Sequence, residues 1–332
     1  MAKAFDPTLN AGLANDISLE IDLSSTEGEK VWLDKGFTIL VGLSALASVA
    51  VLFWMSVVVA QQAWPAIQKY GAQFLWSTDW DIGQLLFGAL PFIYGTIVTS
   101  MIALLIAVPV GIAVALMTSE NLLPEWVKSP LAFTVELIAA IPSVIIGLWG
   151  IFVFTPVFEP VAMWLYQTFD WLIFFSTPPL GQSVLVAGII LAIMVLPTMA
   201  AISREVLLAI PAPLRSASMA LGATRWETIF RVMLPTGASG ILGAAVLALG
   251  RALGETMAVT MVIGNSLQIS PSLLDPGTTI AANIALQFPE ALDPLHIGAL
   301  MYLALILFVL TLVVNVAAVF IVQFVSSKGI GG

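Results

Sequence analysis

Six apolar runs, each long enough to cross a bilayer, constrain this chain of 332 residues more than any other feature. A helix rises about 1.5 Å per residue, so roughly 20 apolar residues span the hydrocarbon core of a membrane. Inside that core an open chain satisfies its backbone hydrogen bonds only as helices. The runs lie at 36–60, 91–118, 131–154, 183–202, 236–264 and 297–325. The sequence therefore predicts an all-α membrane protein with six transmembrane helices.

Composition supports this class. Hydrophobic residues make up 60% of the chain and charged residues 9%, with a mean hydropathy of +1.04. A soluble protein of this length could not bury so much apolar surface. Cysteine is absent, which excludes disulfides and thiol chemistry, and the single histidine, His296, cannot build a histidine metal cluster. We expect no metal ion and no cofactor.

Two stretches depart from the pattern of membrane helices. Residues 1–35 are polar and acidic, and we expect a disordered cytoplasmic tail there, with a short helix near Ile17–Leu23. The membrane domain is then expected at 36–328. Residues 161–175 are apolar but short, and Asp170 interrupts them. Because this stretch also contains tryptophans, it predicts a helix at the membrane interface or a re-entrant segment.

The basic residues predict the orientation of the chain. If it crosses the membrane six times, nine of the 11 lysines and arginines share one side, one lies opposite, and Arg251 lies within a span. The positive-inside rule then places both termini in the cytoplasm. The opposite side holds Lys69, and the nine are Lys3, Lys30, Lys35, Lys128, Arg204, Arg215, Arg225, Arg231 and Lys328.

The basic loop at 203–235 has the pattern of two short helices. Pro213 suits the first turn of one helix, and Gly222 ends it. Thr224 and Glu227 form a capping box that starts the second helix. The apolar face of this second helix is expected to comprise Trp226, Ile229, Phe230 and Met233. Periodicity leaves two interpretations open: helices that rest on the bilayer, or a surface for a cytoplasmic partner.

The same loop resembles a cytoplasmic signature of ABC importer permeases, which reads E-A-A, three residues, G, nine residues, I-x-L-P. Ser216-Ala217-Ser218, Gly222 and Val232-Met233-Leu234-Pro235 occupy it with that spacing. Serine replaces the acid and the second alanine, and valine replaces isoleucine. The resemblance implies that this loop contacts an ATPase subunit. The residues implied in coupling are Arg215, Ser216, Ala217, Ser218, Gly222, Ala223, Leu234 and Pro235.

Residues 86–100, 136–150 and 251–265 resemble signature segments of phosphate-specific ABC importer permeases, of the PstC type rather than the PstA type. The resemblance implies the six-helix core of type I importers with a cytoplasmic coupling helix. It also implies a second, PstA-like permease subunit, two ATPase subunits and an external phosphate-binding protein as partners. The chain contains no G-x-x-x-x-G-K-[ST] loop, so we expect ATP hydrolysis in the partners and no enzyme activity here. No nucleic-acid partner is expected.

Arg251 and Glu255 lie in the fifth predicted span, four residues apart, which places them on one face of a continuous helix. With Thr256, they are expected to line the solute path. Arg251 would offer forked donors to an oxyanion, and Glu255 would orient the guanidinium. The alternative interpretation is a structural ion pair.

A second functional class is a self-sufficient transporter or channel for an anion. In that class Arg251, Glu255 and Glu136 would form an ion relay. It predicts two matching halves, and no convincing repeat is visible in the sequence.

Overall fold

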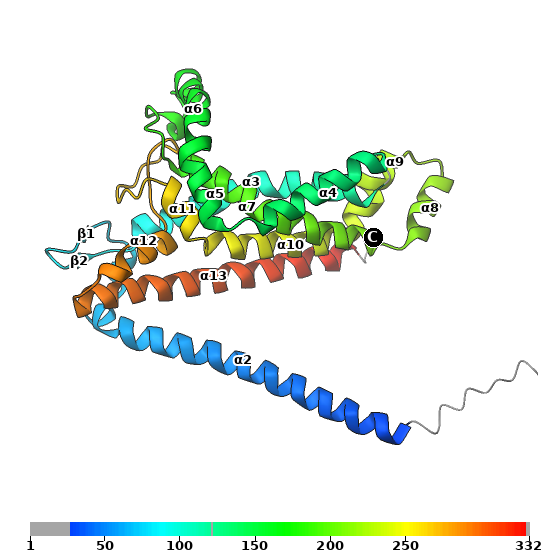
Figure 1. The fold of residues 1–332 in the computed structure, drawn as a ribbon, viewed down its shortest axis with the longest axis horizontal. Helices are drawn as coiled ribbons and strands as arrows, with labels where there is room; N and C mark the ends of the chain where they lie inside the picture. The colour runs from blue at the N-terminus through cyan, green and yellow to red at the C-terminus, as the bar shows by residue number, and fades with distance from the viewer. Residues whose placement is uncertain (1–26, 121, 330–332) are drawn as a thin grey trace, which may run out of the picture. The chain divides into compact units, whose positions relative to one another are not determined.

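The computed structural model describes residues 27–120 and 122–329 (Figure 1). The chain divides into two compact units, Met1–Val57 and Val58–Gly332. The described part of the first unit is helical and belongs to α2, Glu27–Tyr70. The helix therefore begins before Gly36, so residues 27–35 of the predicted disordered tail are helical. The candidate membrane span in this region begins at Lys35, next to the predicted start at Gly36. The short helix predicted at Ile17–Leu23 lies outside the described residues.

The regular structure of the second unit is helical apart from one small hairpin, in which β1, Trp80–Asp81, pairs antiparallel with β2, Leu86–Phe87. Its longer helices are α3 (Leu90–Ser119), α4 (Glu125–Ala140), α6 (Thr155–Phe169), α7 (Val184–Leu208), α10 (Leu234–Leu253) and α13 (Pro294–Gly329). Its shorter α-helices are α5 (Ser143–Trp149), α8 (Ala212–Ala220), α9 (Arg225–Thr228), α11 (Met257–Val262) and α12 (Ile280–Gln287). Two π-helical turns, η3 (Gly150–Phe154) and η5 (Ile229–Met233), and three 3-10 turns, η2 (Gly71–Leu75), η4 (Ile173–Phe175) and η6 (Phe288–Glu290), complete it.

In the described part of the chain, six helices are long and apolar enough to cross a membrane, which agrees with the predicted number. The runs predicted at 36–60, 91–118, 183–202 and 297–325 coincide with α2, α3, α7 and α13. The six candidate spans are Lys35–Leu75, Leu90–Ser119, Ser143–Phe169, Val184–Leu208, Arg225–Leu253 and Pro294–Phe320.

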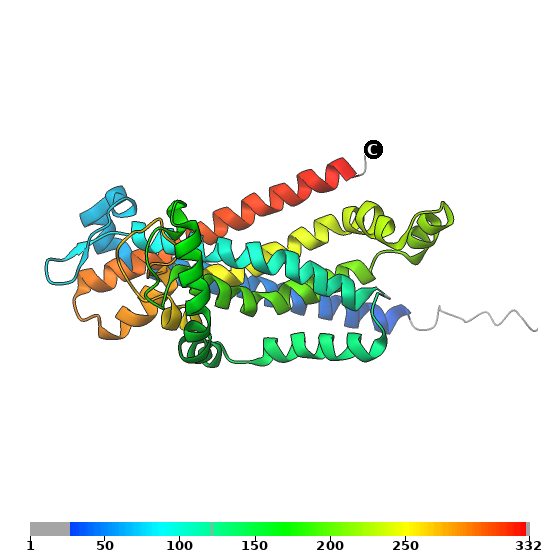
Figure 2. The same cartoon turned by 90° about the horizontal axis from the view of Figure 1, so that it is seen from above.

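The third predicted span, 131–154, is not one helix. Because Pro142 disfavours the α-conformation at the residue before it, Ile141 is extended, with φ −72° and ψ 127°, and α4 ends. The unbroken apolar helix lies at 143–169 and includes most of the interfacial segment predicted at 161–175. In Figures 1 and 2, α4 runs along the direction of α3, α7 and α10, whereas α6 runs across it.

The fifth predicted span, 236–264, has different ends and contains a break. Helix α9 continues through η5 into α10, so no helix begins at Pro235. In η5 the N–H of Leu234 donates to the carbonyl of Ile229, five residues earlier. This π-helical bond shifts the helical hydrogen-bond pattern by one residue just before Pro235. At the other end α10 stops at Leu253, and α11 starts at Met257.

The core of the second unit is the packing of α3 against α7. A Cβ atom on Gly111 would lie 2.6 Å from Cγ of Met199, and one on Gly188 would lie 2.5 Å from Cγ2 of Ile102. Real Cβ atoms do not approach other atoms so closely, so the two backbones depend on glycine for their separation. We infer that α3 and α7 move as one body.

A second apolar cluster lies around the hairpin and the start of α13, where Phe87 is buried. His296 belongs to this region rather than to an exposed interface, since only 3% of it is accessible. Its ring stacks on Phe87 with centroids 5.4 Å apart, and its Nε2 lies 3.0 Å from Oε1 of Gln287. The same oxygen accepts a hydrogen bond from Trp80, at 2.8 Å.

Replacing Gly95 with alanine is expected to destabilise the protein strongly. Its Cβ would lie 1.8 Å from the backbone oxygen of Thr278, and backbone cannot rotate away as a side chain can. We expect a loss of about 3 kcal/mol or more, at the upper end for overpacked cores. Gly243→Ala on α10 is the matched control, because a Cβ atom at that position would have no atom within 4 Å. Thermal unfolding in detergent measures the stability of the two variants. Equal unfolding midpoints for Gly95→Ala and Gly243→Ala would contradict the close contact of Gly95 with Thr278.

Candidate functional site: the α8 corner and the end of α10

The helices of the basic loop lie at one end of the bundle. In Figures 1 and 2, α8 and α9 lie at the end of the bundle where α4 begins and α13 ends, while β1, β2 and α12 lie at the opposite end. The first end carries Lys128, Arg215 and Arg225, together with acids such as Glu120, whereas Lys69 lies at the second end beside the hairpin. The grouping of basic residues expected from the sequence therefore agrees with one end of the fold.

Gly222 ends α8 in a left-handed conformation, with φ +88°. Its N–H donates to the carbonyl of Met219 at 3.0 Å, and the N–H of Ala223 donates to that of Ser218 at 3.3 Å. These two bonds define a Schellman motif. No atom lies within 4 Å of a Cβ at Gly222, so the backbone conformation, not crowding, requires glycine. The predicted helix end at Gly222 is confirmed.

The predicted capping box is also confirmed. The side-chain oxygen of Thr224 accepts a hydrogen bond from the N–H of Glu227 at 3.3 Å. In return, Oε2 of Glu227 accepts one from the N–H of Thr224 at 2.9 Å. Both bonds satisfy backbone donors that the first turn of α9 would otherwise leave unpaired.

The apolar face predicted for the second helix is divided between the interior and the surface. Ile229 and Met233 are buried. Trp226 and Phe230 instead are 57% and 60% exposed and stack on each other with centroids 6.1 Å apart. At the tip of the corner, Leu221 is 90% exposed. Adjacent exposed apolar side chains of this size are typical of an interaction surface.

The remaining predicted coupling residues fall into two groups. On α8, Ala217 is exposed, and the hydroxyl of Ser216 donates to the carbonyl of Ala212 at 3.2 Å. The hydroxyl of Ser218 is half-buried and lies 3.0 Å from that of Thr228. Leu234 and Pro235 form the first turn of α10 and are not part of α8.

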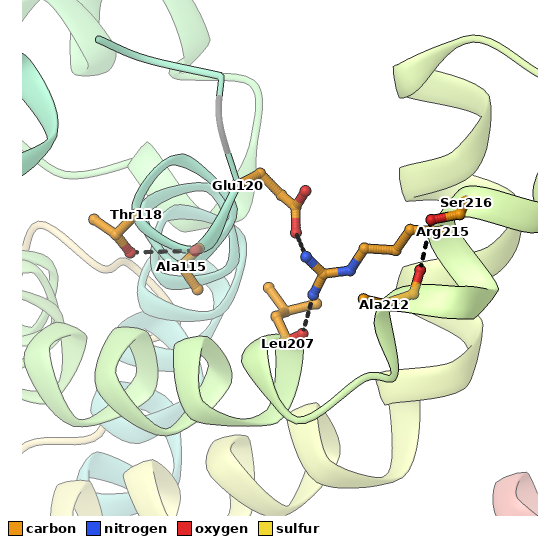
Figure 3. Close-up of polar contacts among 7 residues, drawn as sticks. All are labelled: Ala115, Thr118, Glu120, Leu207, Ala212, Arg215 and Ser216. Atoms are coloured by element: carbon orange, nitrogen blue, oxygen red, sulfur yellow. Dashed lines mark hydrogen bonds and ion pairs between the residues drawn. The ribbon is translucent and has the colours of Figure 1, made fainter. Parts of the chain in front are cut away.

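Arg215 turns inward from α8 (Figure 3). Its Nη1 lies 2.8 Å from Oε1 of Glu120, and its Nη2 donates to the carbonyl of Leu207 at 2.6 Å. A cavity of about 170 Å³ adjoins the ion pair and is lined by Glu120, Leu122, Arg215, Met219, Arg225, Thr228, Ile229 and Met233. The sequence analysis did not identify Glu120. Its only distinguishing feature in the sequence is that it is an acidic residue just after the second apolar run.

Glu255 does not share a helix face with Arg251, because α10 ends between them at Leu253. That prediction is wrong: Glu255 and Thr256 lie in the break before α11. Arg251 is exposed, and its Nη1 donates to the hydroxyl of Thr198 on α7 at 3.3 Å. Among residues 27–120 and 122–329, no ion pair joins Arg251 to Glu255, so the structural pair is not formed either.

These features together define a multi-pass membrane component with an exposed corner at one end and an interrupted fifth span. Within the described residues, no cluster of three or more histidine, aspartate or glutamate side chains could hold a metal ion.

The profile of the binding-protein-dependent transport system inner membrane component family matches residues 107–328, and the chain belongs to this family of multi-pass inner-membrane permeases. It is 46% identical over 258 residues to the phosphate transport system permease protein PstC of Xylella fastidiosa, covering 76% of this chain and 79% of that protein. It is 40% identical over 306 residues to the PstC of Haemophilus influenzae, covering 90% and 96%.

Solved structures support the fold. A bacterial ABC transporter involved in the import of the acidic polysaccharide alginate matches with a TM-score of 0.54 and 17% identity, covering 89% of this chain and 98% of that chain. An inward-facing form of the MetNI methionine ABC transporter matches with a TM-score of 0.51 and 19% identity, covering 72% and 94%. The predicted permease core of a type I ABC importer is confirmed.

Proposed function

We propose that this chain is a membrane-spanning permease subunit of an ATP-driven importer for inorganic phosphate. With a second permease subunit it forms the path for phosphate delivered by an external binding protein. The observation that carries the proposal is the identity of 40–46% to phosphate transport system permeases over 76–90% of the chain. Because the sequence has no nucleotide-binding loop, two partner ATPase subunits supply the energy.

In this proposal the α8 corner, from Pro213 to Glu227, docks on an ATPase subunit and follows its closure as a rigid body. The exposed side chains of Leu221, Trp226 and Phe230 supply apolar contact area. The Schellman motif and the capping box support rigidity, since they fix the backbone on both sides of the corner. Ser216 offers a hydroxyl where the family signature has an acid, so this contact is uncharged.

The phosphate path in this proposal includes Arg251, Glu255 and Thr256 at the break between α10 and α11. An exposed guanidinium on a membrane helix has a high energetic cost unless it faces a partner or water. Arg251 therefore faces the second permease, and the path lies between the two subunits. Glu255, which no ion pair holds among the described residues, is available to orient Arg251 when phosphate passes.

The self-sufficient transporter has less support. Its relay requires Arg251, Glu255 and Glu136 to act in sequence, and the first two do not pair in the part of the chain that the structure describes. Glu136 lines a different cavity, of about 130 Å³, with Arg204 and Glu205 between α4 and α7.

Reconstitution tests the proposed function. The chain, its partner permease, the ATPase subunits and the binding protein are placed in liposomes, and uptake of radiolabelled phosphate is followed. Uptake is expected only with ATP inside and the binding protein outside. Phosphate transport by this chain alone, driven by an ion gradient, would establish the second class instead.

We further propose that both termini are cytoplasmic, which rests on the distribution of basic residues. Reporter fusions after Lys128 and Arg215 are expected to report the cytoplasm. Fusions near Trp80, Asp170 and Asp275 are expected to report the outside. One reversed site among these five would refute the six-span topology.

A further inference from the structure

One guanidinium joins three helices at the end of the bundle that carries α8. Arg215 comes from α8, Glu120 caps the C-terminus of α3, and Leu207 lies in the last turn of α7 (Figure 3). The 2.8 Å ion pair and the 2.6 Å hydrogen bond use different terminal nitrogens of Arg215. The contact with Glu120 is electrostatic, and the hydrogen bond to Leu207 adds a directional constraint on the guanidinium.

Helix α8 has few other attachments. None of its residues is fully buried, so apolar packing against the core contributes little to its position. Its side chains make one further described polar contact outside the helix, from Ser218 to Thr228, and that contact leads to α9. Arg215 is thus the side chain that ties α8 directly to α3 and α7 in the described part of the chain.

The burial of this ion pair distinguishes it from an ordinary surface pair. The side chains of Arg215 and Glu120 are 21% and 17% exposed. The described pair of Lys128 and Glu125, on α4, is longer, at 3.8 Å, and the side chain of Glu125 is 82% exposed. Solvent screens exposed pairs, whereas removing one partner of a sheltered pair leaves an uncompensated charge.

Helix α7 extends from this contact to Arg251. Its Leu207 accepts from Arg215, and its Thr198 accepts from Arg251 on α10. Between these positions α7 also packs closely on α10, because a Cβ on Gly240 would lie 2.6 Å from Cγ2 of Val206. Motion of α8 can therefore reach Arg251 through one continuous helix.

We propose that Arg215 is a positioning residue for transport: with Glu120 and the Leu207 carbonyl it forms a clamp that transmits displacement of α8 to α3 and α7. This inference rests on the proposed function, in which the ATPase moves α8. The guanidinium of Arg215 turns inward to Glu120 and Leu207, so the clamp acts within this chain, while the exposed side chains of the corner face the ATPase.

Arg215→Gln and Glu120→Gln test the clamp in the whole reconstituted complex. Each is expected to lower phosphate uptake per ATP hydrolysed by at least about fivefold, the lower end of common coupling energies. The amount of assembled complex and its ATP hydrolysis without binding protein are expected to be unchanged. The double variant should be no worse than the single variants, because both remove one interaction. Glu125→Gln, which breaks the exposed pair on α4, is the matched control and should transport normally.

A normal ratio of uptake to hydrolysis in Arg215→Gln would overturn the inference. So would a parallel loss of assembly, hydrolysis and uptake, which indicates a purely structural role. Failure of the unmodified complex to import phosphate would refute the proposed function instead.

A second measurement does not depend on transport. The chain has no cysteine, so a spin label attached through Ala217→Cys reports the mobility of α8 alone. Glu120→Gln is expected to raise that mobility, and an unchanged spectrum would overturn the clamp.

Discussion

Gly222→Val is expected to leave the importer assembled in the membrane while phosphate uptake falls about tenfold or more. Gly222 has φ +88°, and a side chain in the left-handed region costs about 1–2 kcal/mol, with β-branched residues the least tolerated. The Schellman bonds of Gly222 and Ala223 would then break, and α8 would lose its fixed angle to α9. Uptake and ATP hydrolysis in proteoliposomes measure the effect, and continued hydrolysis without uptake is the expected signature.

The control for this prediction is Gly222→Asn. Asparagine adopts the left-handed conformation more readily than other residues, and no atom lies within 4 Å of the new Cβ. Uptake by the asparagine variant should therefore stay close to that of the unmodified protein. Equal uptake by the valine and asparagine variants would mean that the conformation of the corner does not matter for coupling.

Arg251→Gln is expected to reduce phosphate uptake at least about a hundredfold while the complex still assembles and hydrolyses ATP. A charge-assisted hydrogen bond contributes about 1.5–3 kcal/mol, and the forked guanidinium can offer an oxyanion two of them. Arg251→Lys keeps the charge but loses the fork, so partial uptake is expected. Phosphate uptake at saturating binding protein is the measurement.

Thr198→Val distinguishes a role of Arg251 in binding phosphate from a role in holding α10 against α7. It removes the hydrogen-bond acceptor on α7 but leaves the guanidinium in place. We expect a smaller loss of uptake than for Arg251→Gln, because the donors remain available to phosphate. Normal uptake by Arg251→Gln would remove Arg251 from the path. Failure of that variant to assemble would indicate that it holds α10 against a neighbouring helix.

Several features were predictable because their causes are local in the sequence. Membrane helices depend on the hydropathy of about 20 consecutive residues, and four of the six predicted runs coincide with single helices. The end of α8 depends on one glycine, and the start of α9 on Thr224 and Glu227, three residues apart. At these helix ends the interacting groups lie within one or two turns of each other. Residue type and spacing were therefore enough to predict where the helices end and begin.

The interruptions were harder to predict. Pro142 lies inside the third predicted run, yet α4 ends just before it and the unbroken apolar helix lies at 143–169. The break after Leu253 contains Gly254 but no proline. A hydropathy profile gives no indication of this break. A run of apolar residues reports that a segment prefers lipid or a protein interior. It does not report whether the backbone stays helical, because neighbouring segments can satisfy the freed backbone groups.

Residue types and their spacing were therefore sufficient to predict the membrane class, the number of candidate spans, the grouping of basic residues and the local geometry of the α8 corner. The pairing of Arg215 with Glu120, the contact of Arg251 with Thr198 and the position of Glu255 beyond the end of α10 became visible only in the folded chain. The physical reason is the range of the interactions. Helix caps and hydropathy depend on neighbours along the chain, whereas the partner of a charged side chain depends on which helices the packing of α3, α7 and α10 brings together.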